Sequence, residues 1–138
     1  MVRYFTAGVW DLFHIGHLNF LRKARMKARN ALFIVGVVTD ESAISYKGYA
    51  PIFPYSQRKA IIESLVFPDF VVSVPKQFDT EQMEALEIDV LILGIEWSEW
   101  VSPELKKLQN KCPIIHLPRT PGISTTDIIA KTRSAKRP

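Results

Sequence analysis

The sequence predicts a doubly wound α/β fold, a parallel five-stranded sheet with helices on both faces. Short apolar runs of strand length alternate with helix-length segments through five rounds, and no internal repeat or low-complexity segment interrupts them. Continuous apolar runs are typical of strands that are buried on both faces of a parallel sheet. Right-handed crossovers would then place the loops that follow the strands at one edge of the sheet, where ligands bind in such folds.

The predicted elements follow in order along the chain. The first strand, residues 2–7, precedes a helix with apolar residues at helical spacing: Leu18, Leu21, Ala24 and Ala28. The other predicted strands are residues 31–38, 69–74, 88–93 and 114–117. The helices predicted between them are residues 54–65, 80–86 and 103–111, and a last helix leads through residues 127–130. Proline stands near the first turn of the first of these helices, and Asp79 or Thr80 caps the second. Residues 42–54 contain Gly48, Pro51 and Pro54 and are predicted to be irregular.

Length and composition indicate one globular domain. The chain has 138 residues, of which 47% are hydrophobic and 23% charged. We expect the domain to span residues 1–130 and the basic segment 131–138 to be a disordered tail. The single cysteine, Cys112, and the lack of a signal pattern or of an apolar run long enough for a membrane span favour a cytoplasmic protein.

The net charge of +4 includes two basic clusters, residues 22–29 and 131–137. A solvated helix face and a frayed tail explain such clusters more simply than nucleic acid does, because no recognition motif accompanies them. We therefore regard a nucleic-acid partner as the weaker interpretation.

The most informative segment is residues 8–17, where the first strand ends and the first helix begins. Such a junction offers unpaired backbone N–H groups and a partial positive charge, which suit phosphate. His14 and His17 add imidazoles that can donate hydrogen bonds to phosphate oxygens, and Gly16 lets the backbone approach a ligand closely. The alternatives are a metal pair, for which the sequence offers few further ligands, and two surface histidines.

Three other segments follow predicted strands or lie in long loops near the same edge. Lys47 lies in the irregular segment and is either solvated or a mobile cation beside the phosphate site. Arg58, in the next helix, either points to the site or pairs with a carboxylate. The segment after Gly94 contains Glu96, Trp97 and Trp100, whose side chains could hold a base and a ribose, or cover the sheet or an oligomer interface.

The last of these segments, residues 118–127, leads into the final predicted helix. Arg119 precedes a Pro-Gly turn, and Ser124 and Thr125 follow it. A guanidinium, hydroxyls and backbone N–H groups can converge there on one anion, although helix capping alone also explains the hydroxyls.

Two of these motifs resemble a known family. His14-Ile15-Gly16-His17 resembles the HxGH signature of the nucleotidyltransferase superfamily, and residues 119–126 resemble the RTxGIST signature of its cytidylyltransferase branch. The resemblance covers about residues 3–130 and is strongest to the glycerol-3-phosphate cytidylyltransferases.

The resemblance implies a Rossmann-like homodimer that transfers CMP from CTP to a phosphorylated small alcohol, such as glycerol 3-phosphate, and releases pyrophosphate. It implies that Mg²⁺ arrives on the triphosphate without dedicated protein ligands. The catalytic residues it implies are His14, His17, Lys47 and Arg119. The implied nucleotide-binding residues are Val9, Trp10, Gly16, Gly94, Glu96, Trp97, Thr120, Gly122, Ile123, Ser124 and Thr125.

The chain departs from the family pattern at several positions. Val9 and Trp10 stand where threonine and phenylalanine are common, Ile95 and Glu96 replace two aspartates, and Val66 replaces an arginine of the glycerol-phosphate enzymes. Val9 and Ile95 leave open an adenylyltransferase that uses ATP with a similar acceptor, whereas Val66, which removes a cation, concerns the identity of the acceptor more than that of the nucleotide. A nucleotide-binding module without turnover is a further alternative, which the retained histidines and cations disfavour.

Overall fold

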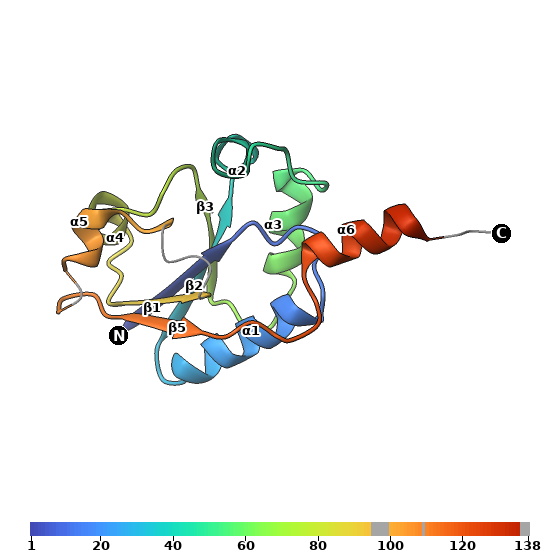
Figure 1. Ribbon diagram of the computed structural model, residues 1–138. Helices are drawn as coiled ribbons and strands as arrows, with labels where there is room; N and C mark the ends of the chain where they lie inside the picture. Colours follow the sequence, from blue (N-terminus) through green and yellow to red (C-terminus); the bar gives the residue numbers. More distant parts are fainter. Residues whose placement is uncertain (95–99, 109, 136–138) are drawn as a thin grey trace.

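The computed structural model describes residues 1–94, 100–108 and 110–135, and these form a parallel sheet between two layers of helices (Figure 1). The five strands are β1 (Arg3–Gly8), β2 (Leu32–Val38), β3 (Phe70–Val74), β4 (Val90–Gly94) and β5 (Ile114–Leu117), in the spatial order β3-β2-β1-β4-β5. All neighbouring pairs are parallel. The order reverses at β1, so the predicted doubly wound, Rossmann-like fold is confirmed.

The helices cover both faces of this sheet. On one face, α1 (Ile15–Lys27) and α3 (Tyr55–Glu63) bury Leu21, Ala24 and Ile62 against Val35 and Ile92. The other face has its own core, which includes side chains from α2 (Asp40–Lys47) and α5 (Pro103–Lys106). A partly buried side chain of α4 (Thr80–Ala85) packs against this core. Each strand contributes to both cores, because successive side chains of a strand such as β1 point to opposite faces of the sheet.

The largest difference from the sequence-based prediction is α2, which occupies much of the segment predicted to be irregular. The Thr39 hydroxyl accepts the Ser42 N–H, Asp40 and Glu41 lie in the positive first turn, and Gly48 ends the helix at φ +83°. Lys47 is therefore the last residue of a capped helix rather than a loop residue.

The last helix, α6 (Thr125–Ser134), is longer than predicted and corrects the boundary of the expected tail. Residues 131–134 are helical, and residues 136–138 lie outside the described part of the chain. In Figure 1, α6 extends away from the sheet. The helix at Pro103 is shorter than predicted and ends at Lys106.

Trp100 belongs to the core. It is 2% exposed and lies near Phe78, with ring centroids 6.3 Å apart. Of the two interpretations of this residue, covering the sheet is therefore the correct one. Among the described residues, no helix combines the length and apolarity that a bilayer span requires.

Candidate active site

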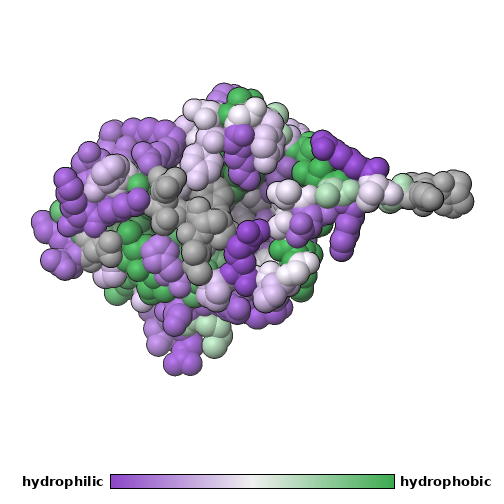
Figure 2. All heavy atoms as spheres, in the orientation of Figure 1, coloured by the Kyte–Doolittle hydropathy of each residue, from purple (hydrophilic) through white to green (hydrophobic). Residues whose placement is uncertain are grey.

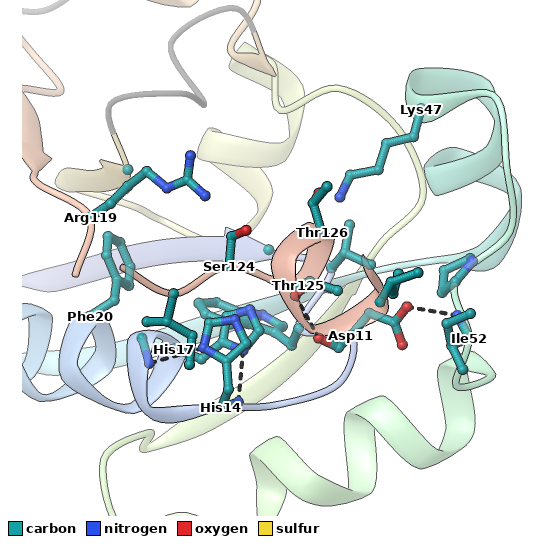
Figure 3. Close-up of a pocket in the computed structure, with 18 of the residues that line it drawn as sticks. Asp11, His14, His17, Phe20, Lys47, Ile52, Arg119, Ser124, Thr125 and Thr126 are labelled. Carbon is teal, nitrogen blue, oxygen red and sulfur yellow. Dashed lines mark hydrogen bonds between the residues drawn. The ribbon is translucent and has the colours of Figure 1, made fainter. Parts of the chain in front are cut away.

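A cavity of about 790 Å³ opens at the carboxyl edge of the sheet. Its walls come from the β1–α1 junction, the end of α2, residues 49–52, Gly94 and the segment from Leu117 through α6. Figure 3 shows the two histidines below, with Lys47 and Arg119 extending from different segments above them. This volume is typical of a site for a small-molecule ligand.

His14 and His17 cap the start of α1 with their own side chains. The backbone N–H of Gly16 donates to His14 Nδ1 at 3.0 Å, and the backbone N–H of His14 donates to His17 Nδ1 at 3.1 Å. This reciprocal pair is a capping box built from two imidazoles, and it stacks the rings with centroids 3.9 Å apart.

The capping bonds also fix where each neutral ring carries its proton. A nitrogen that accepts an N–H has no proton of its own, so each ring holds its proton on Nε2. Burial, followed by the positive charge of Arg119, lowers the pKa of His14. Burial, then His14 and then Lys47 lower the pKa of His17 to about 3. Both rings are therefore neutral at pH 7 and present Nε2–H donors.

Gly16 is required by this arrangement. A Cβ at this position would lie 2.7 Å from Cε1 of His14 and 3.3 Å from Cγ2 of Ile123. The absence of a side chain thus lets the capping imidazole and the segment before α6 close around the start of α1.

Asp11 organises the loop that precedes the histidines. Its carboxylate accepts the backbone N–H groups of Ile52 at 2.7 Å and Phe53 at 2.9 Å, while its backbone carbonyl accepts the Thr125 hydroxyl at 3.1 Å. One residue therefore connects the β1–α1 junction, the segment after α2 and the start of α6.

Arg58 connects several segments at the same edge of the sheet. Its guanidinium, which is fully buried, donates to the carbonyl oxygens of Val9, Val38 and Phe53 and pairs with Asp40 at 2.6 Å. The sequence left the role of Arg58 open, and the structure assigns it to an ion pair rather than to the cavity.

The chain matches a family model described as cytidylyltransferase-like over residues 5–131. It belongs to this family. The resemblance stated from the two motifs is thereby confirmed.

Individual relatives support the same assignment. This cytidylyltransferase-like chain is 37% identical over 130 residues to the glycerol-3-phosphate cytidylyltransferase of Staphylococcus aureus, a match that covers 93% of this chain and 92% of the relative. The corresponding Bacillus subtilis protein is 32% identical over 130 residues, with 93% and 95% covered. FAD synthase of Pyrococcus abyssi is 30% identical over 121 residues, with 85% and 80% covered.

A solved structure agrees in fold. The lipopolysaccharide core biosynthesis protein from Thermoplasma volcanium superimposes with a TM-score of 0.73 at 23% identity and covers 87% of this chain and 98% of its own. At this identity the likeness concerns the fold alone.

Most residues that the sequence singled out lie at the cavity of this cytidylyltransferase-like protein. The lining includes His14, His17, Lys47 and Arg119, together with Val9, Trp10, Gly16, Gly94, Thr120, Ile123, Ser124 and Thr125. Gly122 is not part of this lining, and it forms the turn before α6 at φ +78°. Glu96 and Trp97 lie outside the described residues.

Trp10 has a structural task besides lining the cavity. Its backbone is at φ +59°, and its indole N–H donates to the Gly36 carbonyl at 2.9 Å. The ring also meets His17 edge-on, with centroids 5.6 Å apart. The bulky ring therefore fixes the loop over the sheet, which accounts for a tryptophan at this position.

Other lining residues were missed from the sequence, among them Asp11, Phe20, Tyr46, Ile52, Thr126 and Arg133. Arg133 falls in the segment that was predicted to be a tail, and helical periodicity continued beyond residue 130 would have identified it. Thr126 lies in the predicted segment 118–127, but of its hydroxyls only those of Thr120, Ser124 and Thr125 were assigned to the site. The partners of Asp11 are backbone groups distant in sequence, which no local pattern reveals.

Asp11 is the only acidic residue among the described lining residues, and both its oxygens already accept backbone N–H groups. No group of three or more metal-ligating side chains occurs in the part of the chain that the structure describes.

Proposed function

We propose that this protein transfers CMP from CTP to a phosphorylated small alcohol and releases pyrophosphate. The observation that carries the proposal is the convergence of two neutral imidazoles, Lys47 and Arg119 on one cavity at the start of α1. The full-length similarity to two glycerol-3-phosphate cytidylyltransferases supports CTP and a glycerol 3-phosphate-like acceptor.

In the proposed reaction an oxygen of the acceptor phosphate attacks the α-phosphorus of CTP. The new P–O bond forms as the bond from the α-phosphorus to the bridging oxygen breaks, and pyrophosphate leaves with the electron pair. The acceptor phosphate is already ionised at pH 7, so no residue must remove a proton. Positioning and charge stabilisation then provide the catalysis.

We assign the Nε2–H groups of His14 and His17 to the oxygens that gain charge during this transfer. Lys47 and Arg119 hold phosphate oxygens, with Ser124, Thr125 and the start of α6 nearby. Mg²⁺ carried by the triphosphate neutralises further phosphate charge when bound. The homodimer and the cytoplasmic location remain predictions.

The test is pyrophosphate release from CTP, ATP, GTP or UTP with Mg²⁺ and a panel of phosphorylated alcohols that includes glycerol 3-phosphate. We expect release with CTP, and formation of a CDP-alcohol by mass spectrometry. Release only with ATP would contradict the proposal in favour of adenylyl transfer, the second candidate, which the 30% identity to an FAD synthase favours. Binding of CTP without turnover of any phosphorylated acceptor would instead indicate a binding module.

A further inference from the structure

One wall of the cavity is formed by a single face of α6. Thr126, Ile129, Ala130 and Arg133 line the cavity, and their spacing of three, four and seven residues places them on one side of the helix. At 1.5 Å per residue this face is about 10 Å long. No residue of α6 is buried, so the helix leaves this face open to a ligand.

A second wall of the cavity exposes large apolar side chains. Tyr46 at the end of α2, Tyr49 and Ile52 are 49%, 57% and 59% exposed, and all three line the cavity. Figure 2 shows hydrophobic surface beside the start of α6, next to strongly hydrophilic side chains. Apolar surface that is left open around a cavity marks a place where a ligand covers it.

The charges around these apolar walls have one sign. Lys47 lies between the two tyrosines in sequence, and its side chain extends toward Thr126 (Figure 3). Arg133 is the last lining residue of the α6 face. Asp11 is the only carboxylate among the described lining residues, and it is engaged by backbone N–H groups. This part of the cavity therefore suits an anionic or neutral ligand with apolar carbons, not a cationic one.

We propose that the acceptor is a phosphomonoester of an alcohol with an apolar skeleton longer than glycerol, and that Ile129, Tyr49 and Ile52 hold this skeleton. The inference rests on the proposed function, because it assigns the acceptor side of the same site. A three-carbon skeleton is about as long as one extended residue, about 3.5 Å, and would leave most of the α6 face uncovered. A longer skeleton covers it while its phosphate stays near Lys47.

The test compares three acceptors: glycerol 3-phosphate, 6-hydroxyhexyl phosphate and 6-aminohexyl phosphate. Their affinities are measured by calorimetry with the full chain, Mg²⁺ and a CTP analogue that has a methylene group between the α- and β-phosphorus. We expect 6-hydroxyhexyl phosphate to bind at least about tenfold more tightly than glycerol 3-phosphate, since each buried methylene strengthens binding about fourfold. The amine should bind less tightly than the alcohol of the same length.

Two variants assign the preference to the α6 face. Ile129→Ser should reduce the preference for the six-carbon alcohol over glycerol 3-phosphate by about fivefold or more. Ile128→Ser is the matched control, since Ile128 is the adjacent residue of α6 and does not line the cavity. It should leave the preference unchanged.

Equal affinity for the long and short alcohols, or a preference that survives Ile129→Ser, would overturn the inference. Pyrophosphate release with CTP reports separately on the proposed function. Turnover without a preference for length therefore refutes only the inference, whereas failure of turnover with every acceptor and nucleotide refutes the proposed function.

Discussion

The two sides of the cavity are built in opposite ways. The β1–α1 side is fixed by hydrogen bonds of buried and half-buried groups: the imidazole capping box, the Asp11 carboxylate and the indole N–H of Trp10. The α2–α6 side presents exposed tyrosines and a helix without a buried residue. A reaction centre needs fixed donors, whereas a substrate pocket tolerates change. Substitutions on the first side should therefore affect both fold and chemistry, whereas substitutions on the second side should affect chemistry alone.

The substitution expected to destabilise the fixed side most is Arg58→Met. Removing the guanidinium takes away a donor from three carbonyl oxygens and from Oδ1 of Asp40, whose other oxygen still accepts the Tyr55 N–H. We expect the free energy of unfolding to fall by about 3–5 kcal/mol, as measured by urea denaturation. Arg29→Met is the control, since Arg29 is exposed beyond the end of α1. A similar loss in both variants would show that the buried network does not stabilise this edge.

The next largest effect should follow His17→Ala. Loss of a donor that acts in the transition state should lower kcat by about a hundredfold or more. Loss of the reciprocal cap should also destabilise α1 by about 1 kcal/mol. Steady-state kinetics and thermal denaturation measure the two effects. His116→Ala provides the control, because His116 is exposed on β5 and should be dispensable. Unchanged turnover in His17→Ala would exclude His17 from the mechanism.

Lowering the pH should weaken the β1–α1 side without any mutation, because its two histidines are neutral in the folded chain. The pKa of His17 is about 3 in the folded chain and the pKa of His14 is also lowered, so the unfolded chain binds more protons between about pH 6.5 and 3. Stability is therefore fully present above pH 6.5 and is lost as the pH falls, by up to about 1.4 kcal/mol per unit for each such histidine.

Denaturation at pH 7 and pH 5 tests this expectation, because the carboxylates with lowered pKa, Asp69 and Asp79, titrate below this window. His17→Asn should flatten the dependence between these two values. A stability that stays constant from pH 7 to pH 5 in the wild type would contradict the neutral capping pair.

The smallest of these effects concerns the open side. Lys47→Ala should lower kcat/KM for CTP by about tenfold, since a cation near the phosphates is lost. The free energy of unfolding should change by less than about 0.5 kcal/mol, because Lys47 is exposed at the end of α2. Lys76→Ala, outside the cavity, is the kinetic control. A large loss of stability would remove the distinction between the two sides.

The sequence predicted the parts of this molecule whose information is local. The apolar runs identified all five strands, and His14, Gly16 and His17 located the β1–α1 junction that lines the cavity. The helix α2 was missed because its caps, Thr39 and Gly48, define it rather than an apolar periodicity. The start of α6 and its capping hydroxyls were predicted, and only the length of this helix was misjudged. The partners of Asp11 and Arg58 depend on contacts across the fold, which no linear pattern contains.

The segment from the start of α2 to the start of α3 is held at both ends by hydrogen bonds. Asp11 binds the N–H groups of Ile52 and Phe53, and Arg58 binds the Phe53 carbonyl oxygen, while Asp40 receives the same guanidinium at the start of α2. The stretch between these fixed points, residues 44–51, is exposed or half-exposed throughout. Libraries that keep Lys47 and vary the other positions of this stretch should therefore change the acceptor preference, because both ends of the connection stay held by Asp11 and Arg58.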